Sequence, residues 1–411
     1  MAKTAAELYQ ERVKRVKDAI ELREPDRVPF LPFCHFFPAR YAGMTFKELM
    51  YDYDKLEIAW KKVILDFEPD MYVNPYGLVA LGPTMEALDY KQLRWPGHGV
   101  GDDVSYQFVE GEYMRAEEYD EFLFDPTGFM VRTLFPRICG ILEPLKLLSP
   151  VPWAYYIRII PAIAVLGVPE VAASLQAALK AGAEAYKVVS RSGAFVKEME
   201  SLGFQAQLGA GAYAPFDYIG DFLRGTKGIM LDMYRNPEKL LAATEKVLPI
   251  MISSGATTAK KAGIPRVFIP LHKGLDGFMS LEQFKTFYWP TLRKLILGLI
   301  DSGLTPCVLF EGDCTSRLEV IRDVPAGKAI YWFERTDLVK AKEVLGDKVC
   351  LRGNVPPSLL CTGTPGEVKD YCQKLIKVIG KGGGFILDGA AGIPDEAKAE
   401  NVKAMAESVR G

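Results

Sequence analysis

The chain has 411 residues, of which 49% are hydrophobic and 25% are charged. This composition is ordinary for a globular protein with a large core, and it excludes an extended disordered chain. The 50 Lys and Arg residues nearly balance the 52 Asp and Glu residues. Because no segment is strongly basic, nucleic acids and membranes are not expected partners.

The apolar stretches are interrupted by charged residues, Pro or Gly before they reach the roughly 18 residues of a membrane span. The seven Cys have no paired spacing, which is typical of reduced thiols, so we expect a cytoplasmic protein. The three His are His35, His98 and His272, and the sequence has no CxxC or HExxH motif. A metal site built from several histidines is therefore not expected.

Short apolar runs, each ending in a polar residue, alternate with longer amphipathic stretches along the chain. This alternation predicts βα units and a parallel sheet. Eight runs are short and almost wholly apolar, as expected for strands that are buried on both faces. They cover residues 28–34, 71–74, 204–208, 266–271, 307–310, 329–333, 349–351 and 384–387. Eight such strands predict an α/β fold of the (β/α)8 barrel type, as a single domain over residues 1–411.

Three helices are clearest between these strands. Residues 367–379 carry an i, i+3, i+4, i+7 apolar pattern after Thr364, which can cap the helix. Asn236 and Pro237 open another helix, and residues 280–302 form a long one that is interrupted near Pro290. Residues 95–152 do not follow the alternation, so we interpret them as an insertion after strand two. Within it, residues 104–114 predict a hairpin with Gly111 at its turn.

In a barrel of this type the active site lies at the carboxyl ends of the strands. Titratable and aromatic residues follow most of the predicted strands, which favours a binding or catalytic site over mere solvation of the strand ends. Those chosen as candidates are His35, Arg40, Tyr213, His272, Lys273, Glu311, Asp313, Arg335, Arg352, Asn354 and Asp388.

Several of these candidates have a plain structural alternative. Glu311 directly follows an apolar run, so its carboxylate should be paired, bound to metal or raised in pKa. Pairing with Arg335 or Arg352 is as consistent with the sequence as catalysis. Arg40 could clamp a carboxylate or pair with a nearby acidic residue. Cys314 lies where a helix is expected to begin; its thiol is either activated by the helix dipole or inert.

Several motifs agree with one family. Residues 353–356 (Gly-Asn-Val-Pro), 363–368 (Gly-Thr-Pro-Gly-Glu-Val) and 383–387 match its last strands and helices, and residues 25–29 (Pro-Asp-Arg-Val-Pro) match its opening. The chain resembles the uroporphyrinogen decarboxylase superfamily, which includes tetrapyrrole decarboxylases and methyltransferases that exchange methyl groups with a corrinoid. The resemblance covers most of the chain, implies a (β/α)8 barrel and suggests a homodimer.

The resemblance favours the methyltransferase branch. Decarboxylases of the superfamily carry two arginines before a Tyr; here Arg40 precedes Tyr41, but Phe36 stands where the first arginine is expected. Their catalytic Asp after strand two has no counterpart, and Asn74 lies nearby. Residues 41–48 are more similar to the methyltransferases.

Thiol-activating methyltransferases of this branch bind zinc through residues at positions that correspond here to Leu309, Glu311 and Ala391. The usual zinc ligands are therefore missing, and a metal site would have to use His272 and Glu311. A protein without that zinc should not use a thiol acceptor in that way. It could instead demethylate a substrate such as a methyl ether, where an acid helps the oxygen to leave.

The resulting hypothesis is a methyltransferase acting on a small molecule, with a corrinoid carried by a partner protein, since the chain lacks an Asp-x-His-x-x-Gly motif. Glu311, His272 and Lys273 are the acid–base candidates. Substrate would be positioned by His35, Arg40, Tyr213, Asp313, Arg335, Arg352, Asn354 and Asp388. Two alternatives remain: a decarboxylase of a tetrapyrrole or another acid, and a ligand-binding barrel without catalysis.

Overall fold

A computed structural model describes residues 3–149 and 156–410 of the chain. Its main sheet has six parallel strands that pair in chain order from β6 to β11. A second parallel pair joins β1 to β5. The strands of these two sheets are β1 (Met71–Tyr72), β5 (Gln205–Ala206), β6 (Ala210–Gly211), β7 (Arg266–Leu271), β8 (Thr305–Phe310), β9 (Ile330–Phe333), β10 (Cys350–Val355) and β11 (Phe385–Gly389).

Backbone bonds of residues 28–34 close the two sheets into a ring. Leu31 N–H donates to the Leu387 carbonyl of β11 at 3.0 Å, and Asp70 N–H donates to the Phe30 carbonyl at 2.9 Å. β5 leads directly into β6, and the two together form one position of the ring. Around the ring the order is therefore residues 28–34, β1, β5 with β6, β7, β8, β9, β10 and β11. The predicted (β/α)8 barrel is confirmed. The first predicted strand is reduced to isolated bridges, because Pro29 and Pro32 have no N–H to donate.

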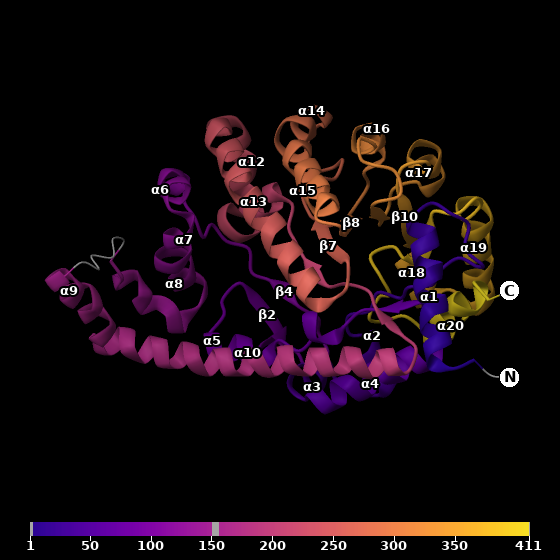
Figure 1. Cartoon of the computed structure of the whole chain (residues 1–411), viewed down its shortest axis with the longest axis horizontal. Coiled ribbons are helices and arrows are strands. Elements are labelled where there is room, and N and C mark those ends of the chain that lie inside the picture. Colours follow the sequence, from indigo (N-terminus) through magenta and orange to yellow (C-terminus); the bar gives the residue numbers. More distant parts are fainter. Residues whose placement is uncertain (1–2, 150–155, 411) are drawn as a thin grey trace.

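Helices surround this ring (Figure 1), and both chain ends lie at the same end of the molecule. Those of the first half are α1 (Ala5–Ile20), α2 (Phe37–Ala42), α3 (Phe46–Tyr51), α4 (Tyr53–Phe67), α5 (Gly82–Leu88), α6 (Tyr119–Phe124), α7 (Pro126–Phe129), α8 (Phe135–Ile138), α9 (Ile159–Ala164) and α10 (Pro169–Ser201). Those of the second half are α11 (Pro215–Tyr218), α12 (Gly225–Arg235), α13 (Pro237–Ala262), α14 (Leu281–Gln283), α15 (Trp289–Asp301), α16 (Leu318–Ile321), α17 (Leu338–Leu345), α18 (Pro357–Thr362), α19 (Pro365–Ile379) and α20 (Ala399–Ser408).

The three predicted helices are confirmed. Thr364 caps α19 in a capping box with Glu367, and Asn236 precedes α13. The predicted interruption near Pro290 takes the form of a π-helical segment, Phe284–Tyr288, between α14 and α15.

The barrel interior is filled in layers by alternate residues of the strands. A lower layer contains Leu31, Met71, Cys307, Ile330, Cys350 and Ile386, and α1 packs against it through Val16, Ala19 and Ile20. The layer above it contains Phe33, Val73, Leu309 and Trp332, with Phe268 packed against them. The residues between them, such as Val308 and Tyr331, face the surrounding helices.

Arg352 and Asp388 form a wholly buried ion pair inside the ring. Both side chains have no exposed surface, and Arg352 donates to the Asp388 carboxylate at 2.6 and 2.9 Å. The guanidinium lies 3.8 Å from the centre of the Trp332 ring. Asp388 also accepts Phe33 N–H at 3.2 Å, so the pair links the seventh and eighth strands to the first.

Between β1 and β5 the chain makes a long excursion. β2 (Leu93–Pro96) pairs antiparallel with β4 (Gln107–Phe108), and β3 (Gly99–Val100) lies on the other side of β2. The hairpin predicted over residues 104–114 is wrong, because residues 107–108 pair antiparallel with the earlier strand β2 and not with residues further along the chain. Met114 N–H instead donates to the Leu223 carbonyl at 2.7 Å, which directs the second half of the segment to the barrel.

The excursion ends in α10, a helix of 33 residues that runs along one edge of the molecule (Figure 1). Among the described residues, we find no single helix with the length and apolar character to cross a membrane. Residues 156–167 and α10 meet that test only jointly, across a 71° bend.

We predict that replacing Asp388 by Asn strongly destabilises the protein. The change leaves the Arg352 charge buried without its partner, which costs about 3–5 kcal/mol in comparable pairs. Urea unfolding followed by tryptophan fluorescence measures the loss. The double variant Arg352→Met, Asp388→Leu removes both charges and should lose much less; an equal loss in both variants would contradict this account.

Candidate active site

His272 and Lys273 immediately follow β7. In that strand Ile269 and Leu271 pack outward, so His272 continues the inward-facing positions and lies at the barrel mouth. Its side chain is about one-third exposed, whereas that of Lys273 is buried. The sequence prediction that these two residues lie at a strand end is confirmed.

Asp221 holds both of these side chains. It lies in a π-helical segment, Ile219–Arg224, that directly continues α11. One carboxylate oxygen lies 2.5 Å from His272 Nδ1, and the other accepts a bond from Lys273 Nζ. His272 is therefore fixed through Nδ1, which leaves Nε2 free to face the mouth.

Asp217, one turn earlier on α11, fixes the backbone of the same strand end. Its fully buried carboxylate accepts His272 N–H at 2.9 Å and Lys273 N–H at 3.1 Å. The Tyr288 hydroxyl donates to it at 2.5 Å, from the second π-helical segment. Asp217, itself held by Tyr288, thus positions the backbone of His272 without a bond to its imidazole ring.

The electrostatics of the cluster favour a protonated histidine. Burial lowers the pKa of His272, but the bond to Asp221 and the charges of Asp217 and Asp221 outweigh it and raise the pKa to about 9. Burial raises the pKa of Asp217 to about 6. Burial also raises the pKa of Asp221, but the bonds from His272 and Lys273 outweigh this effect, so its pKa is lowered. At neutral pH His272 therefore carries a proton on Nε2.

Glu311 follows β8 and faces His272. Its Oε1 lies 3.6 Å from His272 Nε2, which is longer than a direct hydrogen bond, so the two groups are neighbours that are not hydrogen-bonded to each other. Burial raises the pKa of Glu311, while the His272 charge opposes the shift. Among the described residues Glu311 pairs with neither Arg335 nor Arg352, so the structural alternative considered from the sequence does not apply.

This arrangement does not make a metal centre. Within residues 3–149 and 156–410, no three His, Cys, Asp or Glu side chains are placed to hold a metal ion. His272 Nδ1 is already bound to Asp221, so His272 and Glu311 offer at most two ligands. Of the positions where related methyltransferases are expected to bind zinc, Leu309 and Ala391 have no ligand atom in their side chains. The zinc site implied by the resemblance does not fit these residues.

Two further candidates lie at the same end of the barrel. Tyr213 precedes α11 and packs edge-on to Phe222 at 4.8 Å; burial and the Asp221 charge raise its pKa. His35 follows Phe33, and their ring centres lie 5.4 Å apart. Burial lowers the pKa of His35, which favours its neutral imidazole.

The remaining candidates are held elsewhere. Arg352 and Asp388 are paired with each other below the mouth. Asp313 caps the following turn by accepting bonds from Thr315, and the exposed Arg40 lies 3.7 Å from Glu396. Their contact with substrate stays a prediction.

Arg335 and Asn354 line a separate groove beside α17 and α19. Cys314 is buried, and burial raises the pKa of its thiol to about 12, so helix-dipole activation is not observed.

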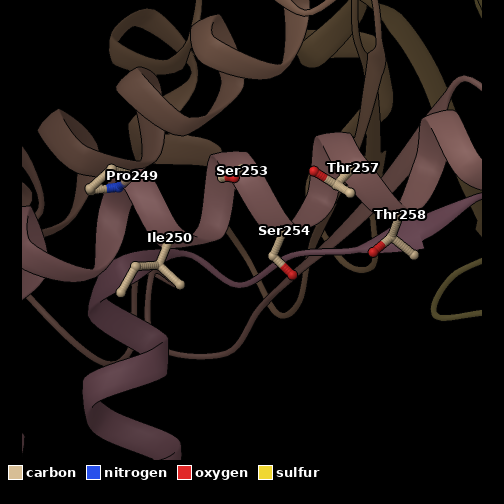
Figure 2. Close-up of a pocket in the computed structure, with 6 residues that line it drawn as sticks. All are labelled: Pro249, Ile250, Ser253, Ser254, Thr257 and Thr258. Carbon is tan, nitrogen blue, oxygen red and sulfur yellow. The ribbon is translucent and has the colours of Figure 1, made fainter. Parts of the chain in front are cut away.

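Asp217, Asp221 and Tyr288 were not predicted from the sequence. Asp217 and Asp221 follow strand three with a spacing of four residues, which places two carboxylates on one helical face beside the barrel mouth. That spacing is the signal that could have found them. By contrast, the hollow in Figure 2 lies on the exposed face of α13, and its six lining residues, Pro249, Ile250, Ser253, Ser254, Thr257 and Thr258, have no titratable side chain.

Comparison with known proteins agrees with this architecture. The family model for uroporphyrinogen decarboxylase (URO-D) matches residues 170–411. The chain belongs to the uroporphyrinogen decarboxylase family. It is 33% identical over 186 residues to a uroporphyrinogen decarboxylase of Pelodictyon phaeoclathratiforme and 26% identical over 183 residues to that of Chlorobium phaeovibrioides. Each match covers 43% of this chain and 50% of the relative, so the chain spans about half the length of these curated relatives.

A solved structure described as a methyltransferase from Methanosarcina mazei has the same fold. It matches with a TM-score of 0.64 and 17% identity, and the match covers 96% of this chain and 97% of that one. Because this match covers nearly the whole chain, the excursion between β1 and β5 is largely included in the shared fold.

We predict that Asp221→Asn lowers the pKa of His272 from about 9 toward the ordinary value of about 6.5. The amide removes the negative charge of Asp221 that faces His272 Nδ1, while the positive charge of Lys273 stays nearby. NMR titration of the imidazole signals measures the pKa, and His272→Gln assigns the signal among three histidines. A pKa that stays near 9 would show that Asp221 is not the cause.

The same shift predicts a pH dependence of stability. The pKa of His272 is about 9 in the folded chain and about 6.5 when unfolded. Its contribution to the free energy of unfolding is therefore fully present below about pH 6.5 and is lost as the pH rises through about 9. Wild type should lose more stability than His272→Gln over this interval in urea unfolding; parallel pH profiles would contradict the shift.

Proposed function

We propose that this protein is a methyltransferase that removes the methyl group of a small methyl ether and delivers it to a corrinoid carried by a partner protein. The observation that carries the proposal is the fixed, protonated His272 facing Glu311 across 3.6 Å. Membership of the family and the fold shared with a methyltransferase support an enzymatic role.

The chemistry requires an acid at the leaving oxygen. When the methyl carbon passes to the electron-rich acceptor, the carbon–oxygen bond breaks and both of its electrons stay on oxygen. A proton must reach that oxygen to release a neutral alcohol. His272 can donate from Nε2, and Asp221 stabilises the imidazolium before transfer. Glu311, with its raised pKa, can orient the oxygen or share the proton.

The surroundings of these groups favour a small, flat and uncharged substrate. Phe33, Phe268 and Trp332 form an aromatic layer inside the barrel, with ring centres 5.1 Å (Phe33 to Trp332) and 5.7 Å (Phe33 to Phe268) apart. Phe33 and Trp332 are buried, so the half-buried Phe268 is the ring of this layer that a substrate can reach. Arg352, the nearest cation in that layer, is neutralised by Asp388. An aryl methyl ether fits such a site better than the four acidic side chains of a tetrapyrrole.

The corrinoid acts here as a second substrate. The amino-acid sequence contains no Asp-x-His-x-x-Gly motif, which supports the proposal that a partner protein presents the acceptor at the barrel mouth. No step through zinc is needed, because an ether oxygen is released by protonation and not by forming a thiolate.

We expect the purified protein to form methylcobalamin when members of a panel of aryl methyl ethers are supplied together with a reduced corrinoid protein. The acceptor change is followed by its absorption spectrum. Glu311→Gln and His272→Gln should each lower the rate about 10²- to 10⁴-fold, as loss of an acid does. Glu282→Gln, which alters an exposed carboxylate on α14, should leave the rate unchanged. Activity should fall as the pH rises through about 9.

Two results would replace this proposal. Release of carbon dioxide from a panel of porphyrinogens, with no methylcobalamin formed, would assign the decarboxylase alternative. Ligand binding without turnover, unchanged in Glu311→Gln, would assign a binding protein.

A further inference from the structure

Glu334 lies at the barrel mouth on the strand next to that of Glu311. It directly follows β9, in which Ile330 and Trp332 face the barrel interior, so Glu334 continues the inward-facing positions. Its side chain is 24% exposed. Glu311 follows the inward-facing Leu309 with the same spacing on the neighbouring strand β8. The two carboxylates therefore extend from neighbouring strands into the same opening.

The carboxylate of Glu334 is bonded to the turn that carries Glu311. Gly312, the residue after Glu311, donates its N–H to Glu334 Oε2 at 2.5 Å. The Gly312 carbonyl accepts Arg335 N–H at 3.2 Å, so both backbone polar groups of Gly312 are held from the end of β9. Gly312 has a φ of +74°, and a Cβ there would lie 3.1 Å from the side chain of Leu275. The turn therefore has a narrowly defined conformation, and Glu334 holds it.

A neutral side chain would suffice as an anchor for this turn. Further along the same turn, Cys314 N–H donates to the uncharged hydroxyl of Thr336 at 3.0 Å. At residue 334 the anchor is instead a carboxylate, although a second carboxylate near Glu311 is electrostatically unfavourable. Arg335 compensates little, because its side chain is 75% exposed and its Nε lies 3.7 Å from Glu334 Oε1. The use of a charged anchor at this position indicates a role in the chemistry of Glu311.

The charges that face Glu311 act in opposite directions. Burial raises the pKa of Glu311, and the charge of His272 opposes this shift. Three carboxylates raise the pKa further, Glu334 most of them, followed by Asp217 and Asp221. Asp217 and Asp221 are bonded to the backbone and the ring of His272, whereas Glu334 is bonded to the turn of Glu311. Glu334 is thus the carboxylate that is placed to adjust Glu311 itself.

We propose that Glu334 is a positioning residue of the candidate site, which holds the turn that carries Glu311 and acts on the reaction through that carboxyl group alone. This inference rests on the proposed function, in which Glu311 orients the leaving oxygen or shares its proton. Asp217 provides the parallel on the other side of the site, since it holds the backbone that carries His272. Each of the two acid–base groups then has its own carboxylate anchor from an adjacent element.

Two substitutions separate the bond from the charge. Glu334→Gln keeps an oxygen that can accept Gly312 N–H and removes the charge, whereas Glu334→Ala removes both. In Glu334→Gln the pKa of Glu311 should fall, because a charge that raises it is lost. Titration of the carboxyl carbons by NMR, in protein with isotopically labelled glutamate, measures this pKa, and Glu311→Gln assigns the signal. Glu319→Gln, at an exposed carboxylate of α16, should leave the pKa unchanged.

The methyl-transfer assay tests the positioning role. With the panel of aryl methyl ethers and a reduced corrinoid protein, Glu334→Ala should lower kcat about 10- to 100-fold and change KM less than about 3-fold, because a misplaced acid slows the chemical step more than binding. Glu334→Gln should lower kcat less, by about 3- to 10-fold. It should also move toward lower pH the limb of the pH–rate profile that is absent in Glu311→Gln.

The effect of Glu334 is then measured in the Glu311→Gln background. There, adding Glu334→Gln should lower the rate by less than about 2-fold, because the group through which Glu334 acts is already gone. An equal loss in the presence and absence of Glu311 would show that Glu334 supports the fold in general, and it would overturn the proposal. Since Glu334→Gln keeps the bond to Gly312, this comparison holds even if Glu334→Ala does not fold.

Failure of this inference can be distinguished from failure of the proposed function. If wild type transfers no methyl group, the proposed function is wrong, and the titration of Glu311 decides whether Glu334 acts on it. A Glu311 pKa that falls in Glu334→Gln and not in Glu319→Gln supports the link. A Glu311 pKa that is the same in wild type and in Glu334→Gln overturns it.

Discussion

The buried pair of Arg352 and Asp388 is the constraint around which the barrel is organised. A guanidinium and a carboxylate without any exposed surface are tolerated only when each satisfies the other, and this pair also takes up Phe33 N–H. The strands that carry it are the last two of the ring, and Phe33 belongs to the first. The pair therefore lies where the ring closes, and it supports the aromatic layer of Phe33 and Trp332.

Two aspartates, Asp217 and Asp221, hold different parts of the candidate site. Asp217 bonds to the backbone of residues 272 and 273 and so fixes where the strand ends. Asp221 bonds to their side chains and so fixes their charge and direction. Because the two functions are separated, the chemistry of His272 can be tuned by Asp221 while the strand end keeps its place.

The fold was largely predictable because strands buried on both faces leave an unmistakable apolar pattern, and polar residues mark their ends. For the same reason His272, Lys273 and Glu311 could be expected to lie at one rim. From the sequence alone, Asp388 could not be distinguished from these rim residues. Nothing in the sequence shows that its side chain is buried inside the barrel in an ion pair with Arg352. Asp217 and Asp221 were missed because they precede the residues they bind by about fifty positions and read as ordinary helical residues. The hairpin prediction failed because a distant carbonyl, that of Leu223, takes the bond that a local turn would have used.

Both helical segments that support His272 are π-helical, and this has a consequence for how such a site can change. A π turn holds one residue more than the equivalent α turn. Removing a single residue from 219–224 would restore regular winding and swing Asp221 by about 100° around its axis. The surrounding apolar contacts would shift far less. Loss of one residue at this point would thus separate the Asp221 carboxylate from the ring of His272 while most of the scaffold keeps its packing.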